Sequence, residues 1–319
     1  MAKQTIQSSY HDMVVTSLLC ELELKVDEAV RCQEMIDRLS VYKPEDKLPV
    51  EVVDFIGNYA DIQIVSQEAS TIGLVVSAGA LLKNALDALM KAINWIIAKL
   101  REIFKYCFDK EFRACKDMLD LQRRLITLSV DMPLKNKFEN ANCDVVTKAY
   151  VDKIIQMSNA LITLIENASK LTDVKYVDTL LNEHGDEGAM MRSADGKMYD
   201  NIPDPEVARN TTYQAAGWTF TGINDTVTQF LAVLKGIEGL KDTSKRLDSA
   251  ASDLKKRAEE AALTGAGSDK VNALQTEAAT KIAMTKVIGY AVAILVRRSD
   301  SILAFVKGLY DEIVAIKKA

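Results

Sequence analysis

Proline and glycine are scarce in this sequence. Its 319 residues include 5 prolines and 14 glycines, and no proline lies between Glu206 and Ala319. Because these two residues most often interrupt helices, their scarcity predicts long helices. Hydrophobic residues make up 48% of the chain and charged residues 27%, a composition typical of a globular rather than a disordered protein. We therefore expect an all-α fold with a substantial apolar core.

Cysteine and histidine are also few, which argues against disulfide and metal chemistry. The cysteines are odd in number and form no CxxC pair, so we expect free thiols in a reducing compartment. They are Cys20, Cys32, Cys107, Cys115 and Cys143. Neither histidine, His11 or His184, has Cys, Asp or Glu around it at the spacing of a zinc site. We expect no metal and no cofactor.

Motifs that carry catalytic chemistry are missing. The sequence contains no GxSxG, no GxxxxGK[ST] and no HExxH. The glycine-rich stretch at 265–270 has no strand before it, and a turn between two helices explains it better than a phosphate-binding loop. The acidic residues at 186–200 do not follow the calcium-binding pattern of an EF-hand. We expect a protein without enzymatic activity.

Long apolar runs are missing as well. A membrane-spanning helix needs about 20 predominantly apolar residues, and the best stretches, Ile72–Leu82 and Gly289–Val296, are too short. The first 15 residues contain no apolar segment of the kind found in secretory signals. We therefore expect the chain to be made and to fold as a soluble cytoplasmic product.

Apolar residues recur at helical spacing through most of the chain. The pattern predicts helices over 5–40, 50–66, 144–171 and, most strongly, 81–125. The last of these carries an apolar face opposite a charged one. This predicted interaction face is formed by Leu86, Leu89, Ile93, Trp95, Ile97, Leu100, Phe104 and Phe108.

The second half of the chain predicts a helical hairpin. Residues 183–205 are the only long non-helical stretch, and Asp195-Gly196 within it predicts a small two-stranded β-hairpin. Two long helices follow, over 224–263 and 268–318. A seam on the first, rich in alanine and serine, predicts close antiparallel packing against the second. Helices of this length are rods of roughly 60 to 75 Å, so we expect an elongated bundle.

Negative charge is concentrated at the start of the chain. Residues 1–68 hold 6 Lys and Arg against 13 Asp and Glu, whereas the remaining residues hold 34 against 32. The formal charges are therefore −7 and +2, and the step suggests that the acidic end has a separate fate or partner. We divide the chain into 1–68, 69–182, the loop 183–205, and the hairpin region 206–319.

The charge step coincides with a short motif. Ser66, Gln67 and Glu68, followed by Ala69, resemble the sites cut by the prohead maturation protease of jumbo tailed phages. A small-residue stretch and an amphipathic helix with spaced aromatics follow, and residues 60–125 as a whole resemble internal head proteins of these phages. The resemblance implies a propeptide at 1–68, removed after Glu68, that directs the chain into the assembling head.

The resemblance also implies partners and a location. These are the prohead protease, other virion proteins or further copies of the chain, and a capsid interior reached from the host cytoplasm. Contact with DNA would be local, because basic residues form only short clusters at 123–124, 255–257 and 297–298.

Two other functions fit the same sequence. An α-helical pore-forming toxin component would conceal an apolar segment, here 72–98, and release it at a membrane. A cytoplasmic scaffold or adaptor would bind partner helices through the hairpin at 224–319. A toxin component should release dye from liposomes, and a head protein should be cut after Glu68. A scaffold should do neither.

Overall fold

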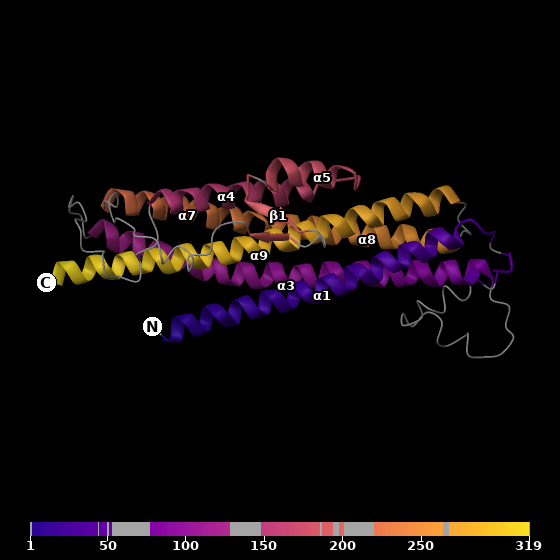
Figure 1. The fold of residues 1–319 in the computed structure, drawn as a ribbon, viewed down its shortest axis with the longest axis horizontal. Helices are drawn as coiled ribbons and strands as arrows, with labels where there is room; N and C mark the ends of the chain where they lie inside the picture. Colours follow the sequence, from indigo (N-terminus) through magenta and orange to yellow (C-terminus); the bar gives the residue numbers. More distant parts are fainter. Residues whose placement is uncertain are drawn as a thin grey trace.

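The computed structural model describes residues 2–43, 45–49, 51–52, 77–127, 148–185, 187–193, 198–200, 220–263 and 268–318. Within these ranges the chain forms seven α-helices, a short π-helix and two strands (Figure 1). The helices are α1 (Ala2–Leu39), α3 (Ala78–Thr127), α4 (Lys148–Ala168), α5 (Tyr176–Leu180), α7 (Phe220–Gly239), α8 (Lys241–Leu263) and α9 (Ser268–Lys318). The π-helix η2 (Leu181–Gly185) precedes β1 (Met190–Arg192) and β2 (Met198–Asp200). The predicted elongated all-α bundle is confirmed.

The helices form where apolar residues recur every three or four positions. The helices predicted at 5–40 and 81–125 correspond to α1 and α3. The small β-hairpin is also confirmed, with Met191 opposite Tyr199 in an antiparallel pair. Of the helix predicted at 50–66, only residues 51 and 52 lie within the described part of the chain, and both are helical.

One predicted helix is divided in two. The prediction of a continuous helix over 224–263 is wrong, because α7 ends at Gly239 and α8 begins at Lys241. Leu240 lies in a turn between them, where its amide donates to the Ile237 carbonyl at 3.1 Å. Glycines at 236 and 239 lower helix propensity at this point.

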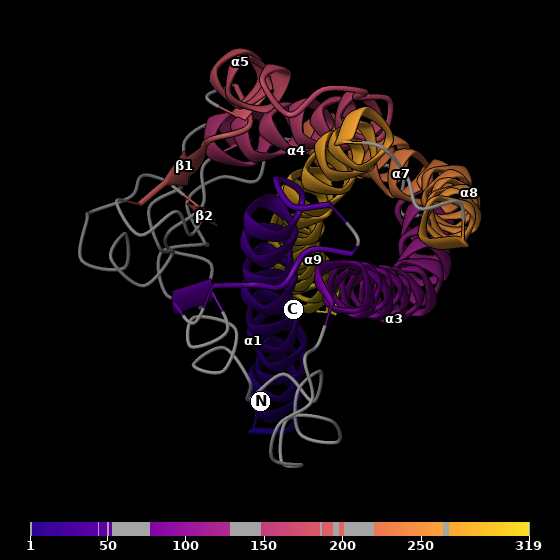
Figure 2. The ribbon, with the colours of Figure 1, turned by 90° about the vertical axis from the view of Figure 1, so that its right-hand side faces the viewer.

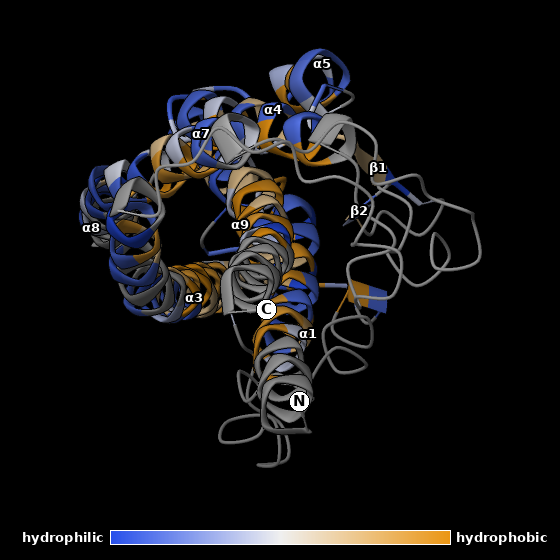
Figure 3. Cartoon of the chain, turned by 90° about the vertical axis from the view of Figure 1, so that its left-hand side faces the viewer, coloured by the Kyte–Doolittle hydropathy of each residue, from blue (hydrophilic) through white to orange (hydrophobic). Residues whose placement is uncertain are grey.

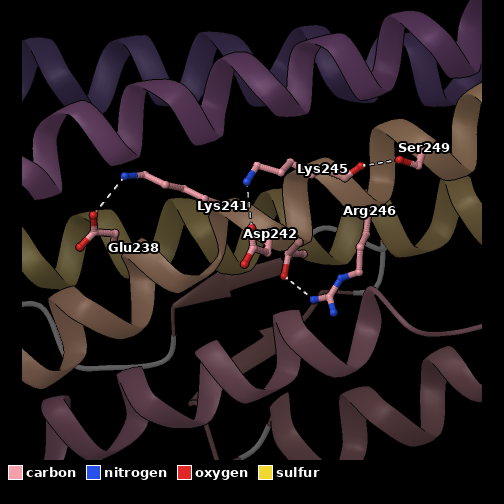
Figure 4. A network of polar contacts seen from close by, with 7 residues as sticks. Glu238, Lys241, Asp242, Lys245, Arg246 and Ser249 are labelled. Carbon is pink, nitrogen blue, oxygen red and sulfur yellow. Dashed lines mark hydrogen bonds and ion pairs between the residues drawn. The ribbon is translucent and has the colours of Figure 1, made fainter.

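Charged side chains on both sides of this break pair locally. Lys241 reaches back to Glu238 at 3.2 Å, and Lys245 contacts Asp242 at 3.0 Å (Figure 4). Both pairs are exposed, and pairs one helical turn apart contribute only about 0.2–0.5 kcal/mol each. These pairs weakly stabilise the helix on each side of Leu240, and they do not determine how α7 and α8 pack in the bundle.

Helix α8 lies between two neighbours. Its predicted seam is buried at Leu240, Leu247, Leu254 and Ala258, and it packs against α3 more extensively than against α9. The sequence predicted α9 as the partner, and an ion pair of 2.5 Å between Arg257 and Glu277 does join the two helices. A single stripe on α8 can serve both contacts, because its buried residues Leu254 and Ala258 share a core cluster with residues of α3 and of α9.

The apolar core has two parts that follow each other along the bundle. One combines α1 with the first half of α3, the end of α8 and the start of α9. The other combines the second half of α3 with α4, α5, the β-hairpin, α7 and the middle of α9. Hydrophobic residues line the inner sides of α3 and α9, and hydrophilic residues the outer side of α8 (Figure 3). Among the described residues, α3, α8 and α9 are the helices that contribute buried side chains to both parts.

Helix α9 runs along the middle of the bundle. Viewed end-on, it is surrounded by α1, α3, α4 and the α7–α8 pair (Figure 2). Its segment Asp269–Ser299 is long and apolar enough to cross a membrane by length and composition, and most of it is buried inside the bundle. The central helix of a soluble bundle has these same properties.

Candidate functional site at the seat of helix α1

The predicted processing residues, Ser66, Glu68 and Ala69, lie outside the described residues. The nearest described residues are Val52 before them and Ser77 after them. Lys47 and Ser77 form an isolated antiparallel bridge, and the amide of Ala78 donates to the Asp46 carbonyl at 3.2 Å. The chain therefore leaves the end of α1 and returns to the start of α3 at one place.

The predicted interaction face is mostly buried within the monomer. Among its members, Leu86, Leu89, Ile93, Ile97, Leu100 and Phe104 are buried. Trp95 is half-buried, and the Phe108 side chain lies outside the described residues. The first four of the buried members share a core cluster with residues of α1. A partner could reach this part of the face only where α1 had left.

Helix α1 is held on α3 and α9 by contacts that we group as the α1 seat. On the body side the α1 seat consists of Trp95 and Lys99 of α3 and Gln275, Gly289 and Tyr290 of α9. Each of these residues has a defined partner on α1. Together they form the candidate functional site, since this is where the acidic end of the chain meets the rest.

The α3 side of the α1 seat is electrostatic and aromatic. The Lys99 ammonium contacts Glu21 of α1 at 2.8 Å and Glu102 of its own helix at 2.8 Å. The hydrogen bonds that Lys99 donates to these carboxylates, to Glu102 first and Glu21 second, raise the pKa of Lys99. Lys99 and Lys25 also lie 5.2 and 5.7 Å from the centre of the Trp95 ring, within the range of cation–π attraction.

The α9 side of the α1 seat contains a reciprocal pair of glutamines. The Gln33 side-chain amide donates to the Gln275 backbone carbonyl at 3.1 Å, and the Gln275 amide donates to the Gln33 carbonyl at 3.2 Å. Gln275 is only 8% exposed, so its amide depends on this bond. Further along α9, the Tyr290 hydroxyl donates to Glu23. Both contacts fix the lengthwise position of α1.

A glycine lets α1 and α9 approach closely. A Cβ placed on Gly289 would lie 3.2 Å from Leu22 Cδ2 and 3.8 Å from Leu100 Cδ1. The first distance is tighter than ordinary packing, and the second is an ordinary van der Waals contact. Leu22 is fully buried there, and further along the helix Cys32 and Ile36 are fully buried as well.

Cysteine reactivity differs sharply along α1. Cys20 is exposed and Cys32 is buried, and both are free thiols. Desolvation, with a smaller effect from Glu28, raises the pKa of Cys32 to about 11. Cys32 is therefore an inert thiol as long as α1 stays in place.

A second polar cluster joins the β-hairpin to α9. Arg298, whose side chain is 3% exposed, donates to the two Asp200 carboxylate oxygens at 2.8 and 3.1 Å and to the Gly188 carbonyl at 2.6 Å. Gly188 fits only because it lacks a side chain, since a Cβ would lie 2.4 Å from Leu161 of α4. We call this the Arg298 clasp, and it anchors the hairpin to the bundle core.

The histidine, acidic and basic side chains considered in the sequence as metal or nucleic-acid ligands do not come together in a site within the part of the chain that the structure describes. Among the described residues, no group of three or more His, Cys, Asp or Glu side chains is placed to hold a metal ion. His184 faces Asn167 at 3.3 Å and Glu187 at 3.6 Å. The basic cluster at 297–298 is divided, since Arg297 is exposed and Arg298 is buried.

Comparisons with protein-family models, curated proteins and solved structures found no match to this chain. The function must therefore be argued from the chain's own residues. Sequence reasoning predicts a junction after Glu68, which lies outside the described residues, and it missed the α1 seat. Gln33 and Gln275 are 242 positions apart, and nothing in the local pattern of either one indicates the other.

Proposed function

We propose that this chain is a non-enzymatic structural protein of the interior of a large tailed-phage head, with residues 1–68 removed by cleavage after Glu68. Its partners would be the prohead protease, other virion proteins and further copies of itself. It would be made in the host cytoplasm and then enclosed in the capsid. The resemblance around 60–125 provides the identity of the particle, and the packing of α1 supports a removable end.

The supporting observation is that the acidic end lies along one side of a body with its own core. Helix α1 packs chiefly on α3 and α9. The larger core cluster has no fully buried member from α1, with only Leu18 and Leu19 packed at its border. Removing α1 would therefore leave all the buried members of that cluster in place. An element that contributes to one side of one cluster is suited to removal after assembly.

Charge gives such a removal a physical purpose. The segment lost has a formal charge of −7, and the part retained has +2. Inside a capsid filled with DNA, an acidic segment is repelled by phosphate, whereas a weakly basic body is tolerated at high concentration. The change of sign would allow local DNA contacts without strong binding.

The test is intact-mass and N-terminal peptide analysis of the protein isolated from its native source. We expect a mature chain beginning at Ala69. A Glu68→Gln variant should remain full length, and a Glu45→Gln variant, also in the acidic region, should be cut normally. A chain that still begins at residue 1 or 2 in mature particles would contradict the proposal.

One observation favours a second candidate, a pore-forming toxin component. The segment Asp269–Ser299 is apolar enough to cross a membrane and is mostly covered by the other helices. This differs from the segment at 72–98 that the sequence suggested. Release of dye from anionic liposomes by the purified chain would support this candidate, and intact liposomes at all protein concentrations would exclude it.

A further inference from the structure

The contacts across the α1 seat are both polar and apolar, and they join α1 to two helices of the body. Polar contacts reach from α1 to both α3 and α9, at Glu21–Lys99, at Lys25–Trp95 and at the Gln33–Gln275 pair. Between and beyond them, α1 buries a row of apolar side chains in the core cluster that it shares with α3, α8 and α9. These are Leu22, Val26, Ala29, Cys32, Met35, Ile36 and Leu39.

We infer that the groove between α3 and α9 is a helix-binding site whose ligand is α1, and that α1 remains bound there after the chain is cut between residues 52 and 77. This inference rests on the proposed function, because it concerns what cleavage after Glu68 would accomplish. Cleavage would turn residues 1–68 from a covalently attached segment into a peptide held by noncovalent contacts. Exposure of the α3 face would then require a second step that displaces or degrades α1.

The lengthwise position of α1 in the groove is set by the reciprocal glutamines. A shift of α1 by one residue would turn the Gln33 carbonyl and amide away from Gln275 and leave the buried Gln275 amide without its acceptor. A buried amide that loses its partner is costly. Gly289 adds a steric constraint, since a Cβ at this position would lie 3.2 Å from Leu22 Cδ2 and would push the leucine side chain by a few tenths of an ångström.

The β-bridge between the end of α1 and the start of α3 also helps to keep α1 attached to the rest of the bundle. Lys47 and Ser77 pair in antiparallel fashion, and Ala78 donates to Asp46. These contacts lie on the α1 side and the α3 side of any cut between 52 and 77. They therefore add to the noncovalent contacts that keep the two fragments together.

The experiment uses the full chain with a site-specific protease sequence inserted between residues 60 and 61. After complete digestion under native conditions, gel filtration and intact mass should find both fragments in one peak. Peptide-resolved alkylation should label Cys20 and spare Cys32, as in the uncut protein. Separation of the fragments, or labelling of Cys32 as fast as Cys20, would overturn the inference.

Two variants test whether the reciprocal glutamines hold α1 in its groove. In the cut protein, Gln33→Ala should speed dissociation of the N-terminal fragment by up to about 10-fold, because it removes the hydrogen bond that the Gln33 side chain donates to the Gln275 backbone carbonyl. Arg31→Ala changes an exposed residue two positions away on the outer side of α1 and should leave the rate unchanged. Equal rates for the two variants would overturn the role of the glutamines even if both fold.

Failure of this inference and failure of the proposed function are distinguishable. The engineered cut does not depend on any processing after Glu68. A chain beginning at Ala69 in particles would uphold the proposed function whether or not α1 stays bound. Conversely, fragments that remain together after the engineered cut would uphold the helix-binding site even if natural particles contain only the intact chain.

Discussion

Removing Asp200 should destabilise the protein far more than removing another aspartate of the same region. The carboxylate of Asp200 is the charged partner of Arg298, whose side chain is 3% exposed. An Asp200→Ala change would leave that guanidinium buried with only the Gly188 carbonyl bonded to it. Breaking a buried pair in this way costs about 3–5 kcal/mol, because the remaining charge is uncompensated.

Asp178 provides the matched control. It pairs with Arg192 of β1 at 3.0 Å, but the two side chains are 75% and 55% exposed. Exposed pairs contribute about 0–1 kcal/mol, so Asp178→Ala should be nearly neutral. The two substitutions remove the same chemical group near the same hairpin and differ mainly in burial.

The assay is urea unfolding followed by far-UV circular dichroism. With a slope of about 3 kcal/mol per molar urea, a loss of 3 kcal/mol lowers the midpoint by about 1 M. A double variant, Asp200→Ala with Arg298→Met, should recover part of the loss, because it removes the unpaired charge. Equal midpoints for Asp200→Ala and Asp178→Ala would refute the assignment of the Arg298 clasp as a buried ion pair.

Three further results are expected. Gly188→Val should lower the free energy of unfolding by about 1–3 kcal/mol, because the new side chain would clash with Leu161. Gly239→Ala should raise it by about 0.5–1 kcal/mol, because nothing lies within 4 Å of the added Cβ. Urea titrations measure both changes. Because its carboxylate partners raise the pKa of Lys99, the ion-pair contribution to the stability difference between wild type and Lys99→Met should be constant from neutral pH to about pH 10.4. It should be lost as the pH rises through the raised value, and an unchanged difference at higher pH would contradict the assignment. Cys32 should resist alkylation at mildly alkaline pH while Cys20 reacts, and equal labelling by peptide mass spectrometry would show that α1 is not seated as described.

Much of the helical architecture could be predicted because its signal is local. The stripe from Leu86 to Phe104 repeats every three or four residues, so it predicts both α3 and the side that becomes buried. The β-hairpin was predictable from Asp195-Gly196 for the same reason. The break at Leu240 was missed because two glycines alter helix propensity by only about 1 kcal/mol each, which tertiary packing can override in either direction.

The contacts that define the α1 seat and the Arg298 clasp could not be predicted. Arg298 belongs to the short basic cluster at 297–298 in the sequence, which shows its neighbour Arg297 but not the carboxylate of Asp200 that the fold brings to it. Gln33 and Gln275 likewise look like ordinary surface residues until two distant helices meet. The junction at Glu68 remains a prediction, because it rests on a short motif and a charge step.

Helix α9 contributes buried residues to both parts of the core, and this affects how the protein unfolds. Two clusters joined only by a flexible connection could melt independently, each as its own cooperative unit. Here α3, α8 and α9 all contribute buried residues to both, and α9 runs 51 residues without a break. Strain introduced at one end is therefore transmitted to the other, and we expect one unfolding transition rather than two.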